Sequence, residues 1–231
     1  MSDKIRFFSL SGGLGLQLTP AVAKLLLPLL RELYPNQEFE LLSSPFSRQK
    51  NHFRFSSPLL LSAEENCLHV TSRLAFGWGT VNEYNFTNLR PALERGKIVI
   101  VLRYGLDLYL YAILCASLCG ESEKVLDLLK QAHRANAELW VLESGIPAPQ
   151  YMVPWVDFDR IEELITPEWI TSNRWLGNID AVKLRRVIQQ EQDQTVEYCA
   201  HPRQRKECRI RAALTAEAMA KAAAEAIGAY L

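Results

Sequence analysis

The sequence has no excess of charge and no long apolar run. Its 26 basic and 26 acidic residues give a formal charge of zero, so no overall field steers nucleic acid or anionic lipid toward the chain. The most apolar stretches, residues 21–30 and 106–118, are interrupted by charged residues or proline and fall short of the roughly 20 residues of a membrane-spanning helix. We therefore expect no membrane partner.

The sequence also has no visible leader segment and few cysteines. The first predicted strand begins so early that it leaves no room for a signal or transit peptide, so we expect a cytoplasmic location. An odd number of cysteines without a CxxC pair favours reduced thiols. The five are Cys67, Cys115, Cys119, Cys199 and Cys208.

Two groups of these cysteines have spacings that would permit a metal site. Cys115 and Cys119 lie four residues apart in a predicted helix, and Cys199 and Cys208 lie near His201. Because a buried cysteine usually behaves as a small apolar residue, we expect no metal at either group.

Strands and helices are predicted to alternate along the chain. With 231 residues, 48% of them hydrophobic, the chain is long enough for one domain over residues 1–231, and we expect disorder only at its ends. Alternation predicts an α/β fold, a three-layer doubly wound parallel sheet of about five strands with helices on both faces. The predicted strands are 4–10, 38–42, 97–102 and 137–142. The predicted helices are 21–34, part of 59–76, 87–95, 106–118, 122–134, 159–164, 181–192 and an alanine-rich 212–229.

A glycine-rich turn follows the first predicted strand. In the phosphate-binding pattern GxxxxGK[ST], Gly12 and Thr19 stand at the required positions, but Gln17 replaces the second glycine and Leu18 replaces the lysine. The lysine supplies positive charge to the phosphates, and leucine cannot. The turn is therefore either a degenerate Walker A loop or an ordinary tight turn between strand and helix.

A second pattern covers residues 88–104. It consists of a predicted helix, a turn at Gly96, a buried strand and the triplet Leu102-Arg103-Tyr104. This order resembles the thymidylate kinase family, in which a helix ending in proline, alanine and leucine precedes a glycine, a strand and Asp-Arg-Tyr. Tyr111 also stands where that family has a tyrosine, whereas Asp107 and Leu108 replace its polar pair.

Two further motifs of the family are partly retained. Gly12, Gly13, Gly15 and Thr19 match its glycine-rich loop, and Ser43-Ser44-Pro45 lies over its Arg-Glu-Pro turn with only the proline kept. The resemblance covers residues 4–145 and is weakest over 146–231, where no arginine-rich lid is recognisable and residues 178–181 only vaguely resemble a last strand.

The resemblance implies a P-loop nucleotide-binding fold, but the expected charges are missing. Leu18, Leu102 and Ser43 replace a lysine, an aspartate and an arginine. Loss of one preorganised charged group commonly costs about 10² to 10³ in rate. We therefore predict a pseudokinase with no catalytic residue and no cofactor. Its vestigial nucleotide-binding residues are Gly12, Gly13, Gly15, Leu18, Thr19, Ser43, Pro45, Leu102, Arg103 and Tyr104.

Two other functions remain open from the sequence. One is an active nucleoside monophosphate (dTMP) kinase that uses ATP and Mg²⁺, with the missing charges supplied by Lys24, Arg48, Lys50 or Arg160. The other is a dinucleotide-binding Rossmann domain, which would need an acidic residue where Ser43 and Ser44 stand. Arg103 could hold an anion or form a structural ion pair.

An inactive chain of this kind would serve a binding or structural role. We expect a protein partner or a homodimer. The basic region from Arg203 to Arg211, ahead of the alanine-rich helix, offers a surface for RNA or an acidic partner, although a solvated helix start explains it as well.

Overall fold

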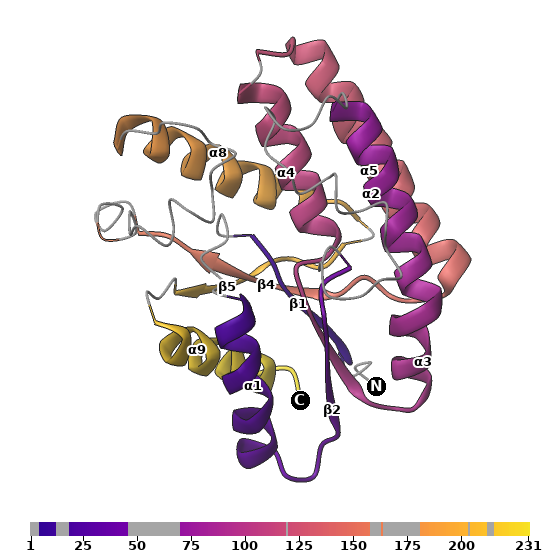
Figure 1. Cartoon of the computed structure of the whole chain (residues 1–231), viewed down its shortest axis with the longest axis vertical. Coiled ribbons are helices and arrows are strands. Elements are labelled where there is room, and N and C mark those ends of the chain that lie inside the picture. Colours follow the sequence, from indigo (N-terminus) through magenta and orange to yellow (C-terminus); the bar gives the residue numbers. More distant parts are fainter. Residues whose placement is uncertain are drawn as a thin grey trace.

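The computed structural model describes residues 5–12, 19–45, 70–118, 120–157, 163, 181–202, 204–211 and 215–231. Within them a central sheet of five parallel strands has the order β2-β3-β1-β4-β5 (Figure 1). The strands are β1 Phe7–Leu10, β2 Phe39–Leu42, β3 Ile98–Leu102, β4 Gln150–Trp155 and β5 Cys208–Arg211. The predicted α/β class with a parallel sheet is confirmed.

Helices cover both faces of the sheet, in three layers (Figure 1). One face carries α1 Thr19–Leu33 and α9 Ala216–Gly228, which pack against each other. The other carries the short π-helix η3 Asn85–Leu89 and the α-helices α2 Val70–Tyr84, α3 Arg90–Glu94, α4 Gly105–Leu118, α5 Glu123–Ser144 and α8 Ala181–Cys199.

Strand β3 shows why both faces need a covering layer. All five of its residues are buried, as expected for a strand inside a parallel sheet. Val99 and Val101 join the core on the α4 face, while Ile98, Ile100 and Leu102 join the core on the α1 face. Side chains of a strand alternate between its two faces, so one apolar run supplies both cores.

The predicted strand at 137–142 is wrong, because these residues belong to α5. The buried residues of α5 are Leu129, His133, Ala137, Trp140 and Ser144, which recur every three or four residues as on one face of a helix. The helix ends at Ser144 and is followed by Gly145, whose φ of 67° suits the left-handed position after a helix.

Strand β4 lies in a proline-rich segment, with Pro147, Pro149 and Pro154, in which no strand was predicted. A proline cannot donate a ladder hydrogen bond and is therefore disfavoured in a central strand. The pairing of β4 with β1 ends at Met152, whereas Pro154 pairs with Ile210 of β5. Pro154 thus has a neighbouring strand on one side, which explains why the strand tolerates it.

Several predicted elements have other limits than expected. Helix α8 extends to Cys199, and α9 begins at Ala216 after Thr215, whose hydroxyl accepts a hydrogen bond from the N–H of Ala218 at 3.2 Å. The predicted helix 87–95 is divided between η3 and α3, with Pro91 in the first turn of α3. Strand β5 was not predicted at all.

Other sequence predictions fall on residues that are not described. Arg48, Lys50 and Arg160, most of the predicted helix 159–164 and residues 178–180 lie outside the described residues, and Ala181 begins α8.

No helix in the described segments combines the length and the apolar character needed to cross a bilayer.

Candidate functional site

Strands β1 and β3 end side by side, and the candidate site lies at this edge of the sheet. Leu10 is in register with Leu102, and the N–H of Arg103 donates to the carbonyl oxygen of Leu10 at 3.0 Å. On the other side of β1, the N–H of Ser11 donates to the carbonyl oxygen of Met152 at 3.1 Å. The predicted glycine-rich turn and the segment after β3 therefore start next to each other.

The centre of this site is the carboxyl group of Asp107, in the first turn of α4. The N–H of Gly12 donates to its Oδ1 at 3.1 Å, and the N–H of Tyr104 donates to its Oδ2 at 3.0 Å. A carboxylate in a first helical turn is favoured by the positive end of the helix dipole and by unpaired N–H groups. Asp107 thus caps α4 and also holds the start of the glycine-rich turn.

Loss of hydration raises the pKa of Asp107. A hydrogen bond with the Ser11 side chain, the positive charge of Arg103 and the two backbone N–H groups act in the opposite direction, because they stabilise the carboxylate. Ser11 is itself buried, and its Oγ lies 2.7 Å from the Oγ of Ser9. Polar groups of β1 and α4 thus form one connected hydrogen-bond network at the end of the sheet.

Gly12 has little room for a side chain. Its φ is 78°, which favours glycine, and a Cβ atom there would lie 3.1 Å from Cγ1 of Val153 and 3.6 Å from Oε1 of Glu191. Glu191 is a buried acid on α8. Two carboxyl groups, those of Asp107 and Glu191, therefore lie close to the first glycine of the predicted phosphate-binding loop.

Arg103 has a backbone conformation that is uncommon outside glycine. Its φ is 59°, in the left-handed region. The hydroxyl of Ser44 donates to the Arg103 carbonyl oxygen at 3.3 Å, and the hydroxyl of Tyr84 donates to the Ser43 carbonyl oxygen at 2.7 Å. The turn after β2 is therefore tied to the end of β3, so the segments of two predicted motifs lie together.

The other residues predicted after β3 belong to the core. Leu102 is 5% exposed and packs on the α1 face. Tyr104 is buried on the opposite face, stacks edge-on against Phe7 at 5.3 Å, and donates its hydroxyl to Oδ1 of Asn85 at 2.6 Å. Tyr104 is therefore a core aromatic residue, and Pro45 is buried as well.

Part of the predicted site lies outside the described residues. Gly13, Gly15 and Leu18 are not described, and of Thr19 the structure describes only that it begins α1. For these positions the nucleotide-binding assignment stays a prediction.

The described residues contain no cluster of three or more His, Cys, Asp or Glu side chains that could hold a metal ion. Cys199 is buried, and burial raises the pKa of its thiol to about 12, which keeps the thiol protonated and unreactive. Cys119 is not described.

The predicted basic surface is partly engaged within the fold. The guanidinium of Arg205 donates to the carbonyl oxygen of Ala148 at 3.2 Å. Arg209 lies 3.8 Å above the Trp155 ring and pairs with Glu207 at 2.9 Å. This region supplies β5 and its approach, so part of its charge serves the fold.

Two residues of the site were missed from the sequence as site residues. Asp107 was noted only as a replacement for a polar residue, although an acid in the first turn of a predicted helix is a recognisable capping signal. Glu191 had no such signal, because only the packing of α8 brings it beside Gly12.

No protein-family model matches the chain, and a search of curated proteins found no match either.

Proposed function

We propose that this chain is a thymidylate-kinase-like protein with a degenerate phosphate-binding loop, which transfers no phosphate and serves a binding or structural role. The observation that carries the proposal is the hydrogen bond from the Gly12 N–H to Asp107. The first N–H group of the loop is already bound to an acid of the chain itself.

The order of the strands supports the P-loop kinase-like part of the proposal. The resemblance requires the glycine-rich loop after the first strand to act together with the triplet after the third, and β1 and β3 are adjacent. In a dinucleotide-binding sheet the second strand lies beside the first, whereas β2 here pairs with β3. The order therefore disfavours the Rossmann alternative.

The charges near Gly12 support the absence of phosphoryl transfer. Such transfer depends on positive groups and a metal ion that neutralise the phosphates. Here the described neighbours of Gly12 include Asp107 and Glu191, and the lysine of the pattern is Leu18. A triphosphate placed at this edge would meet carboxyl groups where the kinases supply cations.

The burial of Leu102 supports the same conclusion. Its side chain packs among apolar residues of β1, α1 and α9 rather than at the edge of the sheet. A carboxylate at that position would lose its hydration, so restoring the aspartate of the family would carry a large free-energy penalty. The core has been adapted to a leucine.

A row of exposed leucines on α5 supports a binding role. Leu128, Leu139 and Leu142 are 56%, 47% and 62% exposed, and their spacing places them on one face of the helix. Exposed apolar side chains that gather on one face are typical of contact surfaces.

One observation favours the alternative, an active nucleoside monophosphate kinase. Arg103 forms no salt bridge with any described residue, although its charge acts on Asp107. A half-buried guanidinium at the end of β3 is available to an anion.

Calorimetric titration with ATP and Mg²⁺, with and without dTMP, tests the proposal together with a coupled turnover assay. We expect no saturable heat and no turnover. A matched Leu18→Lys/Asp107→Ser variant, checked for its fold by circular dichroism, is expected to gain measurable nucleotide binding, because it restores one cation and removes one acid. Saturable binding with turnover in the unaltered chain would contradict the proposal and support the alternative.

A further inference from the structure

Helix α5 has two apolar faces, and the fold buries only one of them. On the inward face, the centre of the His133 ring lies 5.2 Å from that of the Tyr109 ring in α4 and 5.6 Å from that of the Tyr198 ring in α8. The other buried residues of the helix, such as Leu129 and Ala137, recur with His133 at helical spacing. This face is therefore occupied by packing within the chain.

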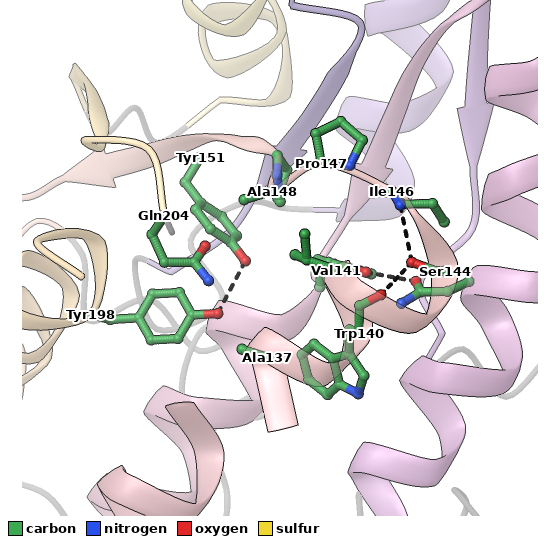
Figure 2. Close-up of a pocket in the computed structure, with 13 residues that line it drawn as sticks. Ala137, Trp140, Val141, Ser144, Ile146, Pro147, Ala148, Tyr151, Tyr198 and Gln204 are labelled. Atoms are coloured by element: carbon green, nitrogen blue, oxygen red, sulfur yellow. Dashed lines mark hydrogen bonds between the residues drawn. The ribbon is translucent and has the colours of Figure 1, made fainter. Parts of the chain in front are cut away.

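The inward face also borders a small pocket near the end of α5. Trp140 and Ser144 lie on one side of a cavity of ≈ 20 Å³, and Tyr151, Tyr198 and Gln204 lie on the other side (Figure 2). Sites for drug-sized ligands have about 300 Å³ or more, so the pocket is too small for such a ligand. A large partner of α5 must therefore bind to another face of the helix.

The second apolar face, which we call the outer seam, lies beside the buried face and is open to solvent along most of its length. Its residues follow one another at alternating intervals of three and four positions. They are Val125, Leu128, Ala132, Ala135, Leu139 and Leu142. Val125 and Ala132 are half-buried, and the other four are exposed. Alternating intervals of three and four are the heptad spacing by which two helices pack along each other in a coiled coil.

Packing within the chain does not account for the outer seam. A surface helix needs one apolar stripe toward its own core. At about 100° per residue, the centre of the outer seam lies about 130° around the helix from the centre of the buried face. Single exposed leucines are common on protein surfaces, but Leu128, Leu139 and Leu142 share one heptad seam. A second helix packed along the seam would bury all three.

The order of residues in the outer seam fits a second copy of the same helix. From either end the seam has two larger apolar residues, then two alanines, then two larger residues. An antiparallel copy of α5 therefore sets larger residues against larger ones and alanine against alanine. The opposed pairs are Val125 with Leu142, Leu128 with Leu139, and Ala132 with Ala135. An interface with a two-fold axis must be complementary to itself, and the outer seam meets this requirement.

The charges beside the outer seam favour the antiparallel direction. Lys124 and Glu143 are exposed at its opposite ends. An antiparallel pair places Lys124 of one copy at the level of Glu143 of the other copy. A parallel pair would place each of these residues, and Glu138 as well, at the level of its own like-charged equivalent, which is unfavourable.

We propose that the outer seam of α5 is a homodimer interface, in which α5 of a second copy of this chain packs antiparallel around a two-fold axis close to Ala132 and Ala135. The alanines let the two helices approach closely at the axis, and the leucines fill the interface on both sides of it. This inference rests on the binding role proposed above and names the partner; it does not use the nucleotide site.

Light scattering of the full chain during size-exclusion chromatography, from about 1 to 200 µM, tests the dimer. We expect a mass twice that of one chain at the upper end of this range. A single-chain mass at every concentration would overturn this inference and leave the proposed function untouched. ATP binding with turnover by a dimer would contradict the proposed function and leave this inference untouched.

A matched pair of variants tests the position of the interface. Leu139→Lys places a charge in two symmetric contacts of each dimer, so we expect the dissociation constant to rise about a hundredfold or more. Leu33→Lys is the control, because Leu33 on α1 is 48% exposed and Leu139 is 47% exposed, and it should leave the dimer intact. Circular dichroism checks that both variants fold. A dimer that withstands Leu139→Lys would show that the interface lies elsewhere.

A double variant tests the direction of the helices. In Leu128→Glu/Leu139→Lys, an antiparallel dimer sets each glutamate against a lysine of the other copy, whereas a parallel dimer sets like charges together. Within one chain the two positions are about 17 Å apart along the helix, so they cannot pair with each other. We expect the double variant to dimerise about tenfold or more tightly than Leu139→Lys alone. Equal or weaker dimerisation of the double variant would overturn the antiparallel arrangement.

Discussion

The two faces of the sheet have cores of different chemistry. The core between the sheet, α1 and α9 is aliphatic, built from leucine, isoleucine, valine, methionine and alanine with Phe8 and Phe39. The core beneath α2, α4, α5 and α8 contains most of the buried aromatic residues. They are Phe7, Tyr84, Tyr104, Tyr109, Trp140, Tyr151 and Tyr198.

This difference separates two ways of stabilising one sheet. Apolar side chains on the α1 face need close packing alone, and the alanines of α9 let that helix approach α1 closely. Tyrosine hydroxyls and amides on the α4 face also need partners at defined positions, such as Asn85 for Tyr104. The face that depends on hydrogen-bond geometry is the face that contains the cavity.

The largest effect is expected on the aliphatic face. Leu26 is fully buried in α1, so Leu26→Ala should remove about 3 kcal/mol from the free energy of unfolding, by lost burial and by the cavity left behind. Urea denaturation measures this change. The control is Leu25→Ala, since Leu25 is 37% exposed. Equal losses in both variants would show that α1 does not anchor this core.

The next effect is a dependence on pH that only the polar face should show. His133 is fully buried, and its Nδ1 accepts a hydrogen bond from Nε1 of Trp78 at 3.0 Å. Burial lowers the pKa of His133 from 6.5 to about 3, so the folded state resists protonation that the unfolded chain accepts. Its contribution to stability is complete above pH 6.5 and is lost as the pH falls toward 3.

Urea denaturation at pH 7 and pH 5 measures this dependence. We expect the free energy of unfolding to fall by about 2 kcal/mol, at a slope of up to about 1.4 kcal/mol per pH unit. His133→Gln should reduce the change in unfolding free energy between pH 7 and pH 5. The control His201→Gln, at a partly exposed position, should leave that change as it is in the unaltered chain. An unchanged slope in His133→Gln would assign the acid sensitivity to other groups.

The smallest effect concerns one hydroxyl group on the polar face. Tyr104→Phe keeps the ring and leaves Oδ1 of Asn85 without its partner, so we expect a loss of about 1–2 kcal/mol in unfolding free energy. Tyr34→Phe on the aliphatic face is the control, because the Tyr34 hydroxyl has no hydrogen bond to a described residue, and should change stability by less than about 0.5 kcal/mol. If Tyr34→Phe lost as much unfolding free energy as Tyr104→Phe, the two faces of the sheet would not differ in their dependence on hydrogen bonds.

The sequence predicted those elements whose pattern is local. The uniform apolar run of β3, the helical spacing in α1, the strongly apolar character of α4 and the alanine-rich sequence of α9 were each recognisable from a few residues. The apolar cluster at 137–142 was assigned to a strand, because a short apolar run fits a buried strand and a buried helix alike. The full length of α5 resolves this, since its buried positions recur at helical spacing from Leu129 onward.

The candidate site was only half predictable. The segments after β1 and β3 were expected to meet, and they do, but the acid that joins them was not assigned that role. Glu191 lies beside Gly12, and Gln204 lines the pocket next to Tyr151 and Tyr198. Both positions depend on contacts between segments far apart in the chain.

The sequence by itself determined the α/β class, the parallel sheet and the presence of leucine at position 18, where a phosphate-binding loop has lysine, because hydrophobic periodicity and residue identity are local properties. Only the tertiary structure decided that Pro154 lies in a strand, that residues 208–211 form its neighbour, and that Asp107 binds Gly12. A strand with proline or with alternating arginines is stable only when another strand pairs with it, and a hydrogen bond across 95 residues exists only once the chain has folded.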